Sequence, residues 1–363
     1  MYMETKMNSR KANIEEYILT IPNMDKKNYI LEIMNELDKK NENIAFHGSC
    51  TDGSITAALL YLYKPEKTYI PLDYNILKDP IIRKYLIKQN WFAIVDLEPF
   101  NKHPLELYID HHRSVIGQTI NSKRIHFEVG ELGPSAAFVL YNSLIGTVSI
   151  PDYMKLLVDV SKVTDTASFR IDPPIEIVTK DNLSFLEDFD KLCWFVQDAT
   201  NVEENYTLQK NNNLIMGLAK EGINFLLSND MITNVNNQRS KRNLAQNFIN
   251  NLTITPLMVI INTPDNSYKQ FISLKLGKLG AKVIVFLNQK DDIITISLRQ
   301  SKLNSKDEIE FYRLDLFAKK FNKSGGGHAE ASGSTSPSLD YAFGIVKKWA
   351  KEKKLKYSVN EYN

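Results

Sequence analysis

Short apolar runs alternate with longer amphipathic stretches through the first half of the chain. The short runs are typical of buried parallel strands and cover residues 44–46, 91–95 and 105–109. The amphipathic stretches predict helices over residues 57–62, 134–145 and 154–163. Ser54 is placed to cap the first of these helices. Repeated alternation of strand and helix predicts a doubly wound parallel α/β sheet.

The second half of the chain changes character twice. Residues 181–250 are rich in Asn, Gln, Lys and Glu and indicate a helical connector with polar faces. From residue 254 a smaller α/β pattern begins, with strands expected at 257–261, 281–286 and 293–299 and a helix at 314–321. The expected domains are therefore 1–200, a connector 201–253, a second domain 254–350 and a frayed polar tail 351–363.

Composition narrows the class of protein only modestly. The chain has 45 Lys and Arg residues and 43 Asp and Glu residues. Its overall charge is therefore nearly balanced and does not require nucleic acid as a partner. The cysteines, Cys50 and Cys193, are too few for a disulfide framework and favour a reducing compartment. No apolar segment has the length of a secretory signal or a membrane span. We therefore expect a cytoplasmic protein that does not enter a membrane.

Acidic and imidazole side chains follow the predicted strands. His47 and Asp52 come after the first, Asp96 after the second, and the triplet Asp110-His111-His112 after the third. Asp165 follows a predicted helix. Each of these aspartates alone is an ordinary turn or cap residue, but ligands bind at the carboxyl edge of such sheets. Their joint occurrence there predicts a metal site.

These residue types suit hard divalent metals. Mn²⁺ and Mg²⁺ prefer carboxylate oxygens, and Mn²⁺ also accepts imidazole nitrogen. A pair of such ions about 3.5–4 Å apart clamps a phosphodiester and supplies hydroxide at neutral pH. We expect two divalent ions, Mn²⁺ first and Mg²⁺ as the alternative, and the chemistry then needs no nucleophilic side chain.

The motifs resemble those of the DHH phosphoesterases that carry a C-terminal DHHA1 domain. The resemblance covers about residues 44–333. In chain order the matching motifs are HGSCTDG (47–53), VDLEP (95–99), DHHRS (110–114), VTDTASFR (163–170), SLR (297–299) and GGGHAEASG (325–333). The resemblance implies a two-domain α/β phosphoesterase that binds a nucleotide end between its domains.

Carried over by position, the resemblance assigns ligands to the metals. It implies that Asp52, Asp96, His111 and Asp165 hold one ion and that His47 and Asp96 hold the other. Asp110 would orient His111. His112 would contact the scissile phosphate or protonate the leaving oxygen, and both roles stay open.

In the second domain the resemblance implies phosphate and nucleotide contacts. Arg299 would grip a phosphate, and Gly325, Gly326 and Gly327 would offer backbone N–H groups to the nucleotide. His328 would contact a terminal phosphate or a base.

Cys50 departs from the family pattern, because most members have an aspartate ligand at this position. A thiolate favours softer ions such as Zn²⁺ or Fe²⁺. The alternative is that Cys50 is a small buried residue that binds nothing.

The function expected first is a metal-dependent phosphodiesterase. It would cleave terminal phosphoesters of short oligonucleotides or single-stranded nucleic acid by attack of metal-bound hydroxide, as an exonuclease or oligoribonuclease would. A nucleotide phosphatase and a cyclic or linear dinucleotide phosphodiesterase are alternatives, and a nucleic-acid-binding scaffold is an alternative of another class. A homodimer is an open possibility for its assembly.

Overall fold

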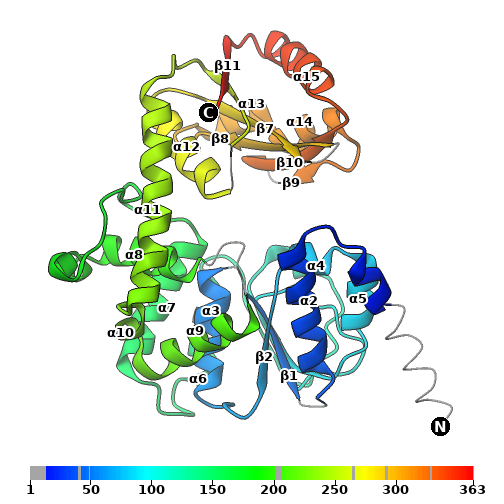
Figure 1. Ribbon diagram of the computed structural model, residues 1–363, viewed down its shortest axis with the longest axis vertical. Coiled ribbons are helices and arrows are strands. Elements are labelled where there is room, and N and C mark those ends of the chain that lie inside the picture. The colour runs from blue at the N-terminus through cyan, green and yellow to red at the C-terminus, as the bar shows by residue number, and fades with distance from the viewer. Residues whose placement is uncertain are drawn as a thin grey trace. The chain divides into compact units, whose positions relative to one another are not determined.

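The chain divides into two compact units, which are described separately below. The computed structural model describes residues 14–39, 42–48, 50–201, 207–263, 266–290, 293–327 and 329–362 (Figure 1). The first unit comprises Met1–Pro174 and Val178–Asn236, and the second comprises Ile175–Ile177 and Asn237–Asn363.

The first unit contains a parallel sheet in the order β2-β1-β3-β4-β5. Its strands are β1 (Asn43–His47), β2 (Thr68–Leu72), β3 (Trp91–Val95), β4 (Leu107–Asp110) and β5 (Ile125–Phe127). The chain leaves β1 for one neighbour, β2, and returns to pair with β1 on its other side through β3. This reversal between β1 and β3 is a topological switch point, where open α/β sheets bind ligands beyond the carboxyl ends of their strands.

Helices cover both faces of this sheet, and its central strands are buried. One face packs against α3 (Thr51–Tyr61), α6 (Ala136–Leu144), α7 (Asp152–Asp165), α8 (Phe189–Thr200) and α9 (Leu208–Glu221). The other packs against α2 (Met24–Leu37), α4 (Tyr74–Leu77) and α5 (Pro80–Leu86). Successive residues of β1 alternate between the two cores, with Phe46 in one and Ala45 in the other. The predicted doubly wound parallel sheet is confirmed.

The second unit contains a mixed sheet in the order β11-β6-β7-β8-β10-β9. The strands are β6 (Leu257–Ile261), β7 (Val283–Lys290), β8 (Ile293–Gln300), β9 (Gly326–Gly327), β10 (Ala331–Ser336) and β11 (Tyr357–Glu361). This unit also contains the helices α12 (Asn266–Lys278), α13 (Lys306–Tyr312), α14 (Leu314–Phe321) and α15 (Leu339–Glu352). The smaller α/β pattern that the sequence predicted is therefore present.

The polar stretch between the two α/β patterns is helical, as expected, but it does not form a separate layer. It contains η2 (Lys180–Glu187), α8, α9, α10 (Ile223–Leu226) and α11 (Asn229–Asn250). Apolar residues of α8 and α9, including Phe195 and Leu218, are fully buried in the first unit's core. Helix α9 is separated from α10 by Gly222, whose φ of +59° favours glycine.

Two local predictions were wrong. Helix α3 begins at Thr51 and its N-cap is Cys50, not Ser54, because the Cys50 thiol accepts the Gly53 N–H. The tail expected to fray from residue 351 instead completes α15 and forms β11, which pairs in parallel with β6. Backbone pairing with β6 gives this polar segment the order that its side chains did not predict.

Candidate metal centre

The predicted acidic and imidazole residues of the first unit converge at the carboxyl edge of its sheet. His47 ends β1, Asp96 directly follows β3, and Asp110 ends β4 and is followed by His111. Helices supply two more carboxylates, Asp52 from the first turn of α3 and Asp165 from the last residue of α7. The site therefore lies at the switch point between β1 and β3.

A close backbone approach brings α3 to the end of β1. A Cβ built on Gly53 would lie 2.1 Å from the His47 carbonyl oxygen, so only glycine fits this position. Glycine next to Asp52 is thus what lets the first turn of α3 pack directly against His47 and delivers the Asp52 side chain to the sheet edge.

Asp96 occupies an uncommon backbone conformation at the centre of the cluster. Its φ is +54°, in the left-handed region that non-glycine residues seldom adopt. Its N–H donates to the carbonyl oxygen of Ile109 at 2.9 Å, which fixes the turn after β3 to the neighbouring strand β4. The Asp96 carboxylate is thereby directed at both His47 and His111. Strain of this kind is concentrated at functional sites.

The His111 imidazole lies among three carboxylates. Its Nε2 is 3.6 Å from Asp52 Oδ2, 3.5 Å from Asp96 Oδ1 and 3.4 Å from Asp165 Oδ2. Within the described part of the chain, His111 Nε2 and Asp96 Oδ1 are buried and have no hydrogen-bond partner. Buried polar atoms are rarely left without a hydrogen-bond partner, so these two atoms call for an explanation.

A metal ion explains these orphaned atoms. Oxygen and nitrogen ligands lie about 2.0–2.2 Å from ions of this kind, so neighbouring ligands around one ion are roughly 3–3.6 Å apart. The separations at His111 fall in this range. The donors are three carboxylates and one imidazole, which suits Mn²⁺. The residues present therefore fit a divalent ion.

The electrostatics of the cluster also favour a cation. Burial, followed by the charges of Asp96 and Asp165, raises the pKa of Asp52 well above its ordinary value. Burial and Asp96 raise the pKa of Asp165 to about 6. Burial opposes ionisation of Asp96, but the neighbouring His111 and His47 imidazoles outweigh it and lower the Asp96 pKa. Since close carboxylates destabilise one another's charge, a positive group among them stabilises the set.

The Asp52 carboxylate is held by a feature that the sequence did not reveal. It accepts the backbone N–H groups of Ala136 at 2.6 Å and Ala137 at 3.0 Å, at the N-terminus of α6. A helix N-terminus attracts negative charge. The helix itself was predicted over 134–145, and an aspartate facing its first turn is a contact that only the tertiary fold creates.

His47, Cys50 and Asp96 form a second cluster of donors. The Cys50 thiol lies 3.1 Å from Asp96 Oδ2, and His47 Nδ1 lies 3.4 Å from the same oxygen. One donor atom from each of the three residues lies within 4.8 Å of the others. Burial, then the charges of Asp96 and Asp52, raise the pKa of the Cys50 thiol well above its ordinary value. Asp96 thus belongs to both clusters, as the resemblance implied for a bridging ligand.

Asp110 contacts a different histidine from the one expected. Its Oδ1 lies 2.7 Å from His112 Nδ1, whereas His111 reaches Asp110 through its backbone N–H, at 2.8 Å. The expectation that Asp110 orients the His111 ring is therefore corrected, because the carboxylate fixes the ring of His112. The Tyr108 hydroxyl lies 2.8 Å from Asp110 Oδ2. Sequence reasoning missed Tyr108, although residues two apart in a strand share a face.

The second unit brings Arg299 and the glycine segment into one part of its sheet. Arg299 on β8 pairs with Ala331 on β10, and the next residue of β10, Ser332, pairs with Gly327 on β9. Gly327 has a φ of +139°, and a Cβ there would lie 2.6 Å from Ala331 O. Gly325 is confined in the same way, whereas Gly326 has open space around it. His328 lies outside the described residues.

None of the helices in the described part of the chain is both long enough and apolar enough to cross a bilayer.

Comparison with known proteins gives matches only at the level of structure. No family model matches the sequence, and no curated protein matches it. A pGpG-specific phosphodiesterase, PggH from Vibrio cholerae, superposes with a TM-score of 0.60 at 17% identity, over 87% of this chain and 99% of that one.

Two further solved structures are similar to this chain. RecJ in complex with Mn²⁺ from Thermus thermophilus gives a TM-score of 0.53 at 13% identity, over 94% of this chain and 56% of that one. The DHH domain of a protein assigned to a family of ribosomal proteins gives a TM-score of 0.52 at 14% identity, over 97% of this chain and 100% of that one. The chain therefore shares the fold of these structures, which is the fold that the resemblance of its motifs to the DHH phosphoesterases implied.

Proposed function

We propose that this protein is a metal-dependent phosphodiesterase that hydrolyses terminal phosphoesters of short oligonucleotides or single-stranded nucleic acid. The observation that carries the proposal is the cluster of Asp52, Asp96, His111 and Asp165 around two buried polar atoms without partners in the described residues. The fold shared with a pGpG phosphodiesterase and with RecJ bound to Mn²⁺ supports it.

The proposed metal ligands form two sets that share Asp96. Asp52, His111 and Asp165 with Asp96 would hold one ion, and His47 and Cys50 with Asp96 would hold the other. Divalent ions bound there would lower the pKa of water and neutralise the charge of a phosphodiester. Mn²⁺ fits the mixture of carboxylates and imidazoles, and Mg²⁺ is the alternative.

Several residues prepare the site without reacting. The N-terminus of α6 holds the Asp52 carboxylate in place and favours its charged form. The left-handed turn at Asp96 aims its two oxygens at different histidines. Burial of both carboxylates removes competing water, which strengthens their attraction for cations.

His112 is the proposed proton donor to the leaving oxygen. Burial lowers its pKa, but the hydrogen bond with Asp110 and the charge of Asp96 outweigh this and raise the pKa to about 9. These contacts favour the protonated form of the ring. With Nδ1 held by Asp110, Nε2 is the nitrogen left to donate to a substrate oxygen. A third of the side chain is exposed, so a substrate can reach it.

In the second unit, Arg299 and the glycine segment are the proposed phosphate and nucleotide contacts. The sheet places them in adjacent positions on β8, β10 and β9. Burial lowers the pKa of Arg299, but arginine keeps its charge in proteins, so the guanidinium is a charged forked donor. His328 is proposed to join them.

A substrate panel tests the proposed function. Protein loaded with Mn²⁺ is assayed with 5′-phosphorylated dinucleotides, labelled single strands, cyclic dinucleotides and adenosine 3′,5′-bisphosphate. We expect turnover of the dinucleotides, and a loss of about 10²-fold or more in His111→Ala. His103→Ala, at an exposed histidine outside the cluster, is the matched control. Unchanged turnover in His111→Ala would show that the activity does not come from this site.

A further inference from the structure

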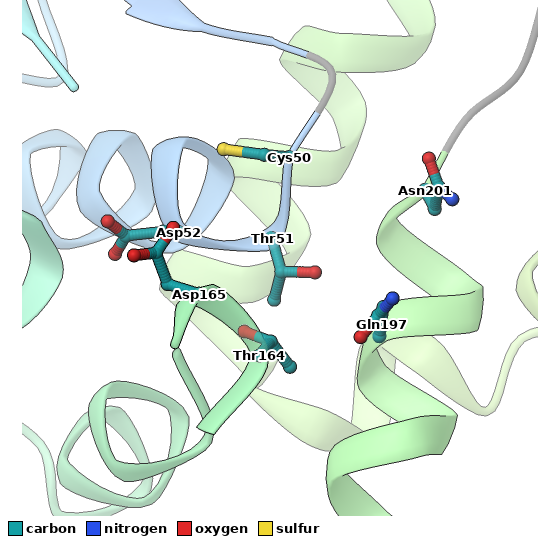
Figure 2. Close-up of a pocket in the computed structure, with 7 residues that line it drawn as sticks. All are labelled: Cys50, Thr51, Asp52, Thr164, Asp165, Gln197 and Asn201. Atoms are coloured by element: carbon teal, nitrogen blue, oxygen red, sulfur yellow. The ribbon is translucent and has the colours of Figure 1, made fainter. Parts of the chain in front are cut away.

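A cavity of about 160 Å³ lies beside the candidate metal centre in the first unit (Figure 2). Part of its lining comes from the metal centre itself, through Cys50, Asp52 and Asp165. The rest consists of neutral polar side chains, namely Thr51, Thr164, Gln197 and Asn201. The function proposed above gives no role to these four residues.

Gln197 and Asn201 form one wall of the cavity. They are four residues apart at the end of α8, so they share one face of the helix, and Figure 2 shows both across the cavity from Thr51 and Asp165. Gln197 Oε1 is buried and has no hydrogen-bond partner in the described part of the chain. A carboxamide with a buried oxygen left unpaired is costly unless something else binds it.

Two contacts connect the end of α8 to other segments beside this wall. The Thr200 hydroxyl lies 2.8 Å from the Thr51 hydroxyl, which joins the helix to the start of α3. Trp194, one turn before Gln197, stacks on Phe169 with ring centroids 3.7 Å apart. Phe169 follows Asp165 in the chain by four residues. Residues on either side of Gln197 therefore contact segments that carry proposed metal ligands.

The chemistry of the lining selects the kind of ligand. Among the described residues, the lining contains two carboxylates and neither lysine nor arginine, so a second phosphate is disfavoured. Carboxamides and hydroxyls both donate and accept hydrogen bonds, as nucleobase edges and ribose hydroxyls require. The volume is smaller than the roughly 300–1,000 Å³ of pockets that enclose a whole small molecule. One neutral part of a nucleotide matches these limits.

We propose that Gln197 and Asn201 bind the base or ribose of the nucleotide whose phosphodiester lies at the metal centre, and so determine substrate preference. This inference rests on the proposed function. Because the contacts are made beyond the reacting phosphate, they should act mainly on substrate binding.

The test compares substrates with and without a nucleoside. Gln197→Leu and Asn201→Leu are assayed on 5′-phosphorylated diadenylate and diguanylate, their 2′-deoxy counterparts, and bis(4-nitrophenyl) phosphate, which has a diester but no sugar or base. We expect kcat/KM for the dinucleotides, divided by that for the aryl diester, to fall at least tenfold, mainly through KM. A deficit that disappears with deoxy substrates assigns the ribose, and one that persists assigns the base.

Asn142→Leu makes the same substitution at an exposed asparagine of α6 and should leave the ratio unchanged. A ratio within twofold of the wild type in both α8 variants, with normal circular dichroism, would overturn the inference.

Calorimetric binding of AMP and GMP to the Mn²⁺-loaded protein separates this inference from the proposed function. If the wild type hydrolyses no diester, the function fails. The inference then stands on at least tenfold weaker mononucleotide binding by Gln197→Leu, and fails without it.

Discussion

The two donor clusters at the sheet edge share Asp96 but differ in composition and in support. The cluster around His111 draws Asp52 and Asp165 from separate helices, and one of these carboxylates is fixed by the N-terminus of α6. The cluster around Cys50 combines Asp96 with His47, from the same strand and turn as Cys50, and its third donor is the Cys50 thiol. One edge of one sheet thus presents a hard site and a softer one.

This difference implies unequal metal preferences. Carboxylate and imidazole donors suit Mn²⁺ or Mg²⁺, whereas a thiolate favours Zn²⁺, Fe²⁺ or Co²⁺. The cluster around His111 should therefore be the one that fills first with Mn²⁺. The following experiments separate the two clusters.

Removing a donor from each cluster should give unequal losses. We expect His111→Ala to reduce kcat by about 10²-fold or more, since it removes a nitrogen that faces three carboxylates. Cys50→Ala should cost about tenfold or less in Mn²⁺, because a thiol is a poor ligand for that ion. Steady-state kinetics at saturating Mn²⁺ measures both. Equal losses would mean that the clusters do not differ as described.

Metal binding to the cluster around His111 should strengthen with pH. Burial lowers the His111 pKa, but the adjacent Asp96 carboxylate and the charges of Asp52 and Asp165 outweigh this and raise it to about 9. Below that pH a metal must displace a proton from His111, so affinity should rise by up to about tenfold per pH unit between pH 7 and 9. Calorimetry in buffers of different ionisation enthalpy counts the released protons. A pH-independent affinity would contradict this arrangement.

Cobalt offers a spectroscopic reading of the softer cluster. A Co²⁺ ion bound by the Cys50 thiolate should show a sulfur-to-metal charge-transfer band, which Cys50→Ser abolishes. Cys50→Asp should remove the same band and raise Mn²⁺ affinity by roughly tenfold, because it supplies a carboxylate oxygen instead. A cobalt spectrum identical in the wild type and Cys50→Ser would mean that Cys50 is only a buried cap of α3.

The smallest effect should come from Tyr108. Its hydroxyl supports Asp110, which in turn holds His112. Tyr108→Phe should lower kcat by only a few fold and shift the alkaline limb of the pH–rate profile, since the environment of the Asp110–His112 pair changes. A profile identical to the wild type would remove Tyr108 from the account.

Much of the sheet edge could be predicted because its strands are apolar runs that end in charged residues. The strands at 91–95 and 257–261 and the helix at 314–321 match their observed bounds. The contacts that depend on tertiary packing could not be predicted. Nothing local marks Asp52 as a partner of α6, and Gln197 lies in a stretch whose polar composition indicated a helical connector with polar faces.

The pairing inside the DHH triplet was mispredicted for a related reason. The sequence places Asp110 beside both histidines, and only side-chain geometry decides which ring it reaches. The C-terminal strand was missed because a polar edge strand is stabilised by backbone bonds to β6 and not by an apolar pattern.

Binding of Mn²⁺ to wild-type protein and to Asp96→Ala, measured by equilibrium dialysis, tests the central claim most directly. Asp96 is the one donor that both clusters share. The account predicts binding of two ions per wild-type chain, with the first at least tenfold tighter, and loss of most binding at both sites in Asp96→Ala. Binding that is the same in the two proteins would contradict a metal centre built around Asp96.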